Sequence, residues 1–284
     1  MRTRLAAAGS AALVALAFLA LSPSLSAQWP AYPDRNVPLT PDGQPDRDAP
    51  APRTPDGKID FTGVWLNAWF YDGRVRELPV SPPGEPPAAT FADVFANFEG
   101  DPPFQPWAAQ LKAERREQNA KDNPDAFCLP MGLMQFHMHP QPRKIIQTPS
   151  VIVVLYEGNA GIRQILTDGR PLPDNEPQPW WYGYSIGRWE GDTLVVETTG
   201  FRDDGWLDIY GSPRTDAAKM TERWRRLNYG TVQIDVTIDD PKAYTEPFSL
   251  RVHHRLLLDG TTDAELIEFV CNENNRSLEH MVGK

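Results

Sequence analysis

Apolar and polar residues alternate in short runs along residues 143–239, and a turn follows each run. The clearest run is 230–239, in which apolar residues share one face and polar residues share the other. The apolar face of this run carries Val232, Ile234, Val236 and Ile238. A period of two places successive side chains on opposite faces of a strand. The turns at 158–161, 190–192 and 228–230 each contain the glycine that tight hairpins need, so the pattern predicts a mainly β fold.

The same pattern predicts about ten strands, and sheets of that size usually curl or split into two layers. The predicted strands are 59–70, 143–148, 150–157, 161–168, 182–189, 193–200, 218–228, 231–239, 247–257 and 264–271. We expect an antiparallel, lipocalin-like β-barrel of about 8–10 strands, with a β-sandwich as the alternative. Either fold would include one or two short helices.

A Pro-rich arm over residues 28–58 precedes the sheet. The tetrad Thr-Pro-Asp-Gly occurs in it at 40–43 and again at 54–57. Proline sets φ at the second turn position and glycine permits a positive φ, so both tetrads predict turns. We expect a single barrel domain over 59–284.

A Pro-rich and helical insertion over about 71–126 interrupts this domain after its first strand. A short helix is expected at 89–98, with Thr90 as its N-cap. A charged surface helix is expected at 106–122, with proline near its start.

Residues 1–27 have the pattern of a secretory signal peptide. Arg2 and Arg4 precede an uncharged apolar run at 11–21, and small residues lead to a cleavage site after Ala27. The run is shorter than the roughly 20 apolar residues that a membrane span needs. We therefore expect a periplasmic or secreted protein that does not insert into a membrane after cleavage.

The net charge of the chain limits the classes of molecule that it is expected to bind. The formal net charge is −10, and loss of the two arginines of the signal peptide changes it to −12. Nucleic-acid binding requires clustered Lys and Arg, so an acidic exported protein does not fit that class. A neutral or cationic small molecule is the expected partner, and the oligomeric state is left open.

Cys128 and Cys271 are the two cysteines of the chain. Thiols of exported proteins usually pair, so we predict a disulfide between them rather than a catalytic thiol.

Asp60-Phe61-Thr62-Gly63-Val64-Trp65 resembles the opening strand of lipocalin-like barrels, which carry a Gly-x-Trp motif. The resemblance implies that Trp65 closes the barrel floor beneath an arginine of a late strand, and Arg251 or Arg255 is the candidate. The chain departs from that family at Thr167-Asp168-Gly169, where a lipocalin has Thr-Asp-Tyr, and in its long insertion.

A wider resemblance runs over about 126–275. Cys128-Leu129-Pro130, residues 187–192 and residues 237–241 are similar to blocks of a family of exported bacterial proteins without an assigned activity. This resemblance implies export and a single domain, and it implies no chemistry.

His137 and His139 form the sharpest local motif. In a strand these two side chains would point the same way and could offer two imidazoles to one metal ion. A third ligand would have to come from His254, Glu197 or Asp168. Solvent-facing histidines on a strand edge are the alternative, and we predict no metal ion and no organic cofactor.

His254 lies on the apolar face of its predicted strand, either as a neutral core histidine or as an acid–base group inside the barrel. Glu197 and Asp168 are the candidate carboxylates beside it. An unpaired buried carboxylate is very costly, so Arg163 and Arg223 are candidate partners. Glu197 pairing on the outer surface across the sheet is the alternative.

Trp180, Trp181 and Tyr184 form an aromatic cluster that either stacks on a sugar ring or flat ligand or plugs one end of the barrel. Signatures of serine hydrolases, phosphate loops, dinucleotide folds and zinc proteases are absent from the sequence. Two hypotheses follow. The barrel binds a small apolar or aromatic molecule in its lumen, or it is a lyase, isomerase or hydrolase that uses acid–base chemistry there. Whether the protein is an enzyme is left open, and convergence of the histidines and carboxylates in one concave site would favour catalysis.

Overall fold

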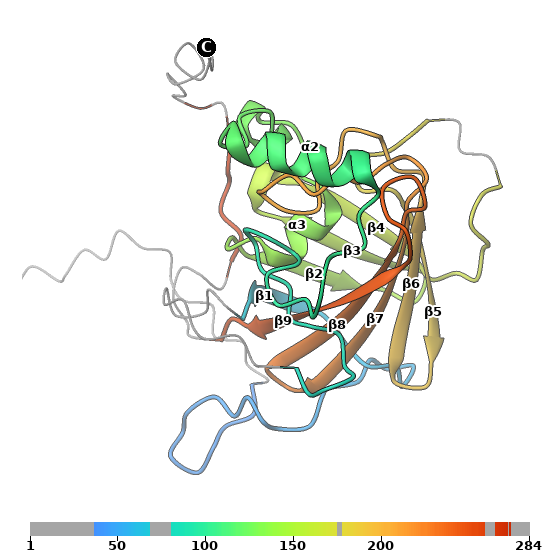
Figure 1. Ribbon diagram of the computed structural model, residues 1–284. Coiled ribbons are helices and arrows are strands. Elements are labelled where there is room, and N and C mark those ends of the chain that lie inside the picture. The colour runs from blue at the N-terminus through green and yellow to red at the C-terminus, as the bar shows by residue number, and fades with distance from the viewer. Residues whose placement is uncertain (1–36, 69–80, 175–177, 259–264, 272, 274–284) are drawn as a thin grey trace, which may run out of the picture.

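The computed structural model describes residues 37–68, 81–174, 178–258, 265–271 and 273; the predicted signal peptide and the start of the predicted arm lie outside them. In these residues nine strands close into a barrel (Figure 1). The strands are β1 (Gly63–Asn67), β2 (Arg143–Gln147), β3 (Val151–Tyr156), β4 (Ile162–Leu166), β5 (Tyr184–Glu190), β6 (Thr193–Thr199), β7 (Lys219–Asn228), β8 (Thr231–Asp239) and β9 (Phe248–Leu256). The predicted barrel is confirmed, and its closed form is consistent with a lipocalin-like architecture.

Neighbouring strands follow chain order, and β1 pairs with β9 to close the barrel. Every pair is antiparallel except β4 and β5, which run parallel. The connection over residues 167–183 is long enough for the crossover that a parallel pair requires. The predicted tenth strand at 264–271 is wrong, because the described residues 265–271 form no strand. Pairing of β1 with β9 leaves no free edge for it.

The period-two pattern gives the correct inward faces. Val232 of β8 pairs with His254 of β9, and Ile234 pairs with Val252. All four of these side chains are buried. These alternate residues of β8 and β9 therefore fill part of the barrel interior, as the sequence predicted.

Helices gather at one end of the barrel (Figure 1). These are α2 (Pro106–Glu117), the 3-10 turn η2 (Pro124–Phe127) and α3 (Leu133–Met138), and all six residues of α3 are buried. The expected helix at 106–122 is confirmed but ends at Glu117. No described helix combines the length and the apolar character that crossing a bilayer requires.

The helix expected at 89–98 is wrong, because that segment forms only turns. Thr90 does accept from the backbone N–H of Asp93, as a cap would. The next amides, however, bond to carboxylates: Val94 donates to Asp208 and Phe95 donates to Asp93. These bonds replace the backbone acceptors that a helix would use, and Phe95 is left free to enter the core.

Trp65 packs toward the opposite end, and its indole N–H donates to the carbonyl of Phe61. The arginine over its ring is Arg226 of β7, 4.9 Å from the ring centroid. The prediction of Arg251 or Arg255 for this role is wrong. Arg251 pairs with Asp235 and Glu85, and Arg255 donates to Thr231. Their inward neighbours Leu250, Val252, His254 and Leu256 occupy the other face of β9.

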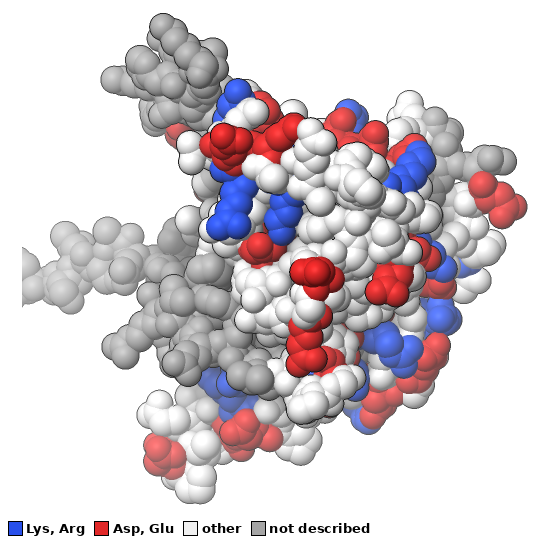
Figure 2. Space-filling model, viewed as in Figure 1, with Lys and Arg blue, Asp and Glu red and all other residues white. Residues whose placement is uncertain are grey.

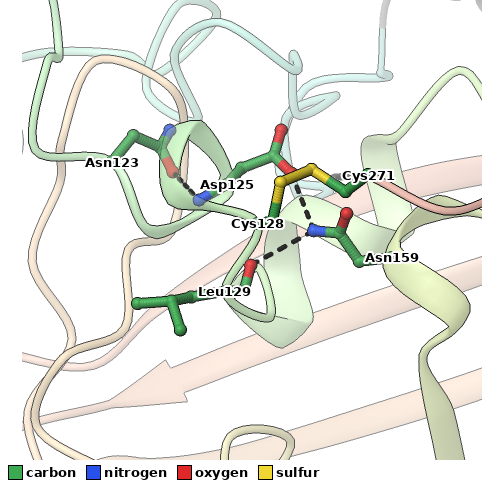
Figure 3. The surroundings of a disulfide bond; sticks show 6 residues. All are labelled: Asn123, Asp125, Cys128, Leu129, Asn159 and Cys271. Atoms are coloured by element: carbon green, nitrogen blue, oxygen red, sulfur yellow. Dashed lines mark hydrogen bonds between the residues drawn. A yellow bond between two sulfur atoms is a disulfide. The ribbon is translucent and has the colours of Figure 1, made fainter. Parts of the chain in front are cut away.

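Cys128 and Cys271 form a disulfide, which confirms the predicted pairing (Figure 3). The bond ties the end of η2 to the C-terminal segment rather than to a strand. Asn159 reinforces the same corner by donating to the carboxylate of Asp125 and to the carbonyl of Leu129. The segment that leads into α3 is therefore fixed from two sides.

Both Thr-Pro-Asp-Gly tetrads form turns in which the threonine hydroxyl donates to the aspartate two residues on. Arg53 docks the second turn on the barrel through an ion pair with Asp192. On the face shown in Figure 2, acidic and basic side chains of the described residues are interspersed. That the protein does not bind nucleic acid stays a prediction.

Candidate functional site

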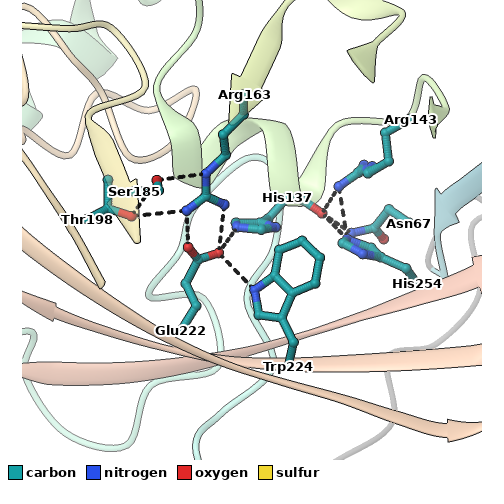
Figure 4. Close-up of polar contacts among 9 residues, drawn as sticks. All are labelled: Asn67, His137, Arg143, Arg163, Ser185, Thr198, Glu222, Trp224 and His254. Carbon is teal, nitrogen blue, oxygen red and sulfur yellow. Dashed lines mark hydrogen bonds and ion pairs between the residues drawn. The ribbon is translucent and has the colours of Figure 1, made fainter. Parts of the chain in front are cut away.

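A cluster of polar side chains lies inside the barrel beneath α3 (Figure 4). We call it the interior cluster, and it comprises Asn67, His137, Arg143, Arg163, Ser185, Thr198, Glu222, Trp224 and His254. His137 descends from α3, and the others come from strands. Figure 4 shows His137 between two halves, with Arg163 and Glu222 on one side and Arg143 and His254 on the other.

Glu222 organises the first half. Its carboxylate accepts from both terminal nitrogens of Arg163 and lies 2.5 Å from Nε2 of His137. Arg163 also donates to the hydroxyls of Ser185 and Thr198, at 3.2 and 3.0 Å. Burial favours a higher pKa for Glu222, but Arg163 and His137 outweigh it and hold the pKa well below its usual range. Glu222 is therefore an anion, and its charge-assisted bonds satisfy the guanidinium.

Arg143 organises the second half, and its acceptors are neutral. Its terminal nitrogens donate to the carbonyls of His137 and His139, both at 3.1 Å. Nε2 of His254 lies 2.9 Å from one of these nitrogens and 2.8 Å from the carbonyl of His137. Asn67 donates to the same carbonyl of His137. Burial lowers the pKa of Arg143 to about 10, so this guanidinium is still charged at neutral pH.

The histidines of this region are neutral. Burial is the main cause that lowers the pKa of His137, His139 and His254, and the charge of Arg143 lowers each further. The pKa of His139 falls to about 4. Because the Glu222 carboxylate only accepts, His137 carries its proton on Nε2 and has a free lone pair on Nδ1. A carboxylate that orients an imidazole in this way leaves the second nitrogen basic.

Stability is expected to fall as the pH drops from 6.5 toward 4. A histidine whose folded-state pKa lies below the unfolded value of 6.5 binds fewer protons folded than unfolded, so its contribution is complete above 6.5 and is lost below. At about 1.4 kcal/mol per pH unit, His139 alone accounts for about 3 kcal/mol. Glu222 adds nothing in this window, because its pKa is lowered and matters only below 4.5.

Urea denaturation at pH 7.5, 6.5, 5.5 and 4.5 measures this dependence. The variant His139→Gln, compared with wild type, is expected to flatten the curve while the other buried histidines still contribute. A free energy of unfolding that stays constant across the window would contradict neutral buried histidines.

Three of the predicted site residues lie on the outer surface. Glu197 pairs there with Arg188 and Lys219, which matches the alternative reading of this residue. Asp168 pairs with Arg170 in a turn, and Arg223 pairs with Glu190 across the sheet. The structure therefore does not bring Glu197 or Asp168 to His254, because alternation along β6 points Val196 and Thr198 inward and Glu197 outward.

His137 and His139 do not lie on a strand. His137 is in α3 and points at Glu222, whereas His139 follows the helix and packs edge-on against Phe91, with 5.2 Å between ring centroids. The strand geometry assumed for a shared metal ion is therefore wrong. Within the described ranges, no group of three or more His, Cys, Asp and Glu side chains is placed to hold a metal ion.

Sequence reasoning missed Glu222 and Arg143. The segment Met220–Trp224 alternates like the other strands, and Glu222 lies on its apolar face between Met220 and Trp224. A charged residue at such a position signals a buried ion pair. Arg143 carries no comparable signal, because it opens its strand next to a lysine.

A cleft of about 500 Å³ opens to solvent at the helical end of the barrel. We call it the rim cleft, and the residues that line it are Arg115, Asp122, Pro124, Phe127, Leu129, Trp181, Arg202, Asp204 and Trp206. Phe127 and Leu129 flank Cys128, and each is 45% exposed. The disulfide thus holds an exposed apolar wall in place.

Two arginines stack on the tryptophans of the rim cleft. The guanidinium of Arg115 lies 4.2 Å from the ring centroid of Trp206, and that of Arg202 lies 4.6 Å from Trp181. Burial lowers the pKa of Arg115, and Arg202 pairs with Asp204 at the cleft. Flat apolar walls beside guanidinium groups suit an aromatic ligand with polar substituents.

The three aromatic residues of the predicted cluster do not lie in one site. Trp181 contributes to the rim cleft, whereas Trp180 is 49% exposed and meets Tyr184 edge-on outside it. Neither tryptophan plugs the barrel.

A larger cleft of about 670 Å³ runs along the Pro-rich residues 81–88 and reaches Phe98. Its walls contain no tryptophan among the residues described. The rim cleft, which has Trp181 and Trp206 in its walls, therefore offers more aromatic surface for recognition. No family model, no characterised protein and no solved structure matches this chain.

Proposed function

We propose that this chain is an exported β-barrel protein that binds a small aromatic molecule with polar substituents in the rim cleft. The observation that carries the proposal is the cleft itself. Ligand pockets commonly measure about 300–1,000 Å³ and combine apolar walls with a few convergent polar groups. The rim cleft lies in that range at about 500 Å³ and supplies aromatic walls, two guanidinium groups and the two carboxylates of Asp122 and Asp204.

Packing inside the barrel favours the rim cleft over the lumen as the ligand-binding site. The described side chains inside the barrel are packed: α3 is buried, and so are the inward residues of β8 and β9. Phe136 of α3 stacks on Tyr156 of β3 with 4.2 Å between ring centroids, which holds the helix against the wall. A ligand in the lumen would have to displace these contacts.

The probe 8-anilinonaphthalene-1-sulfonate tests the rim cleft, because it joins aromatic rings to an anion that the arginines can bind. Trp181→Ala is expected to weaken its binding about tenfold, since loss of a stacking contact with its buried area costs about 1.4 kcal/mol. Fluorescence titration measures the change. Trp107→Ala is the matched control, because Trp107 is 45% exposed on α2 and lies outside the cleft.

Equal binding by wild type and Trp181→Ala would contradict the proposal. Native mass spectrometry of protein purified from its own host supplies the second measurement. A bound organic molecule that is lost in Trp181→Ala and retained in Trp107→Ala would identify the natural ligand and place it in the cleft.

Acid–base catalysis is the second candidate, and one observation favours it. His137, oriented by Glu222, and His254 lie together, with 5.9 Å between ring centroids, and Nδ1 of His137 has no partner. Two of the predicted catalytic or binding histidines thus converge. Incubation of the purified protein with its co-purified molecule separates the candidates, because conversion supports catalysis and an unchanged molecule supports binding.

A further inference from the structure

We propose that the interior cluster holds a small monovalent anion, a halide or a short carboxylate, against Arg143. The proposal is independent of the rim cleft and concerns a different part of the molecule. It rests on the contrast between two buried arginines of the same cluster.

Arg163 and Arg143 are buried to the same degree, at 2% exposed each. Arg163 has an acidic partner, because Glu222 binds both of its terminal nitrogens. Arg143 makes no ion pair with any residue that the structure describes, and its bonds go to two backbone carbonyls and one imidazole. Among the described residues, one buried guanidinium is thus neutralised by a carboxylate and the charge of the other is not.

The charge balance of the cluster shows the same imbalance. Two arginines and one carboxylate leave one positive charge, because the histidines around them are neutral. Carbonyl dipoles partly offset a buried cation, but a buried charge ordinarily requires a counter-charge. Glu222 does not supply it, since Arg163 and His137 already engage its carboxylate.

One N–H group of Arg143 lacks an acceptor. Nε of Arg143 is buried without a hydrogen-bond partner among the described residues. A buried guanidinium N–H that has no acceptor, on a cation that has no acidic partner there, suits an anion.

The size of the anion follows from the packing. Arg143 lies over the ring of Tyr156, with 5.9 Å from its guanidinium carbon to the ring centroid, and beneath the buried helix α3. His137 and His254 stack beside it. These packed surroundings exclude a bulky anion, so the proposed anion is a halide or a formate-sized carboxylate.

Thermal unfolding in sodium chloride, sodium bromide or sodium formate, each against sodium gluconate at the same ionic strength, tests the proposal. Gluconate is monovalent but too large for the interior. We expect the small anions to raise the Tm of wild type by a few degrees relative to gluconate, because a ligand that binds only the folded state stabilises it. A comparison of the Tm in the halides with the Tm in formate shows whether the site prefers a halide or a short carboxylate.

Arg143→Met is expected to lose this anion response. The matched control is Arg223→Met, which removes a surface guanidinium paired with Glu190 and should respond like wild type. An equal response in Arg143→Met and wild type would overturn the proposal.

Diffraction from wild-type crystals grown in bromide decides the question if Arg143→Met does not fold. An anomalous peak in contact with the Arg143 guanidinium supports the site. Crystals with no such peak, together with no Tm difference between bromide and gluconate, would refute it.

Discussion

Replacing Glu222 by Gln is expected to lower the free energy of unfolding by about 3–5 kcal/mol, the cost of leaving a buried charge without its partner. Gln keeps the shape of the side chain but removes the charge that holds Arg163. His137 would lose the same partner. Urea denaturation with the disulfide intact measures the loss.

Glu197→Gln is the matched control, because this residue also forms two ion pairs but does so at the surface. Exposed pairs contribute up to about 1 kcal/mol, so the control should differ little from wild type. The double variant Arg163→Met with Glu222→Leu should recover most of the stability, since apolar residues can replace a buried ion pair without loss. If Glu222→Gln and Glu197→Gln lowered the free energy of unfolding equally, burial would not determine how much each ion pair contributes to stability.

Loss of the disulfide has the second large effect. Cys128 and Cys271 are 143 residues apart. Closing so long a loop stabilises by roughly 5 kcal/mol in the chain-entropy model, and measured losses run from about 2 to 5 kcal/mol. The double variant Cys128→Ser with Cys271→Ser is therefore expected to unfold at a clearly lower urea concentration.

The C-terminal segment should respond first in that variant. Apart from the disulfide, a bond from the amide of Ile267 to Glu157 and an ion pair between Lys144 and Glu265 hold it to the barrel. Hydrogen exchange of the Ile267 amide should accelerate, while the β7 and β8 amides stay protected. Reduction of wild type should reproduce the variant, and an unchanged urea midpoint would show that the loop closure adds no stability.

The strands were predictable because their signal is local. A period of two is a property of neighbouring residues, and β8 occupies the predicted residues 231–239. Val232, Ile234, Val236 and Ile238 face the interior for the same reason. Glycine-containing turns set the hairpins, and the cysteine pairing followed from an expected export route and an even count.

The errors arose where distant contacts override local preference. Residues 135–139 alternate like a strand, yet most of them form the helix α3, whose six side chains are buried beneath the loops at the end of the barrel. The segment 89–98 has helical spacing, but the Asp208 carboxylate takes a backbone amide that a helix would use. The parallel pairing of β4 with β5 likewise has no signal in the alternation of either strand.

The sequence by itself determined the mainly β class, the inward faces of the strands and the two cysteines that pair. Tertiary structure alone decided that His137 meets Glu222, 85 residues away, and that Arg143 lies beside His254 without an acidic neighbour among the described residues. Alternation states which face a side chain occupies, but only closure of the barrel brings particular faces within hydrogen-bond reach. Chemistry that requires several side chains at one point is therefore a property of the closed sheet.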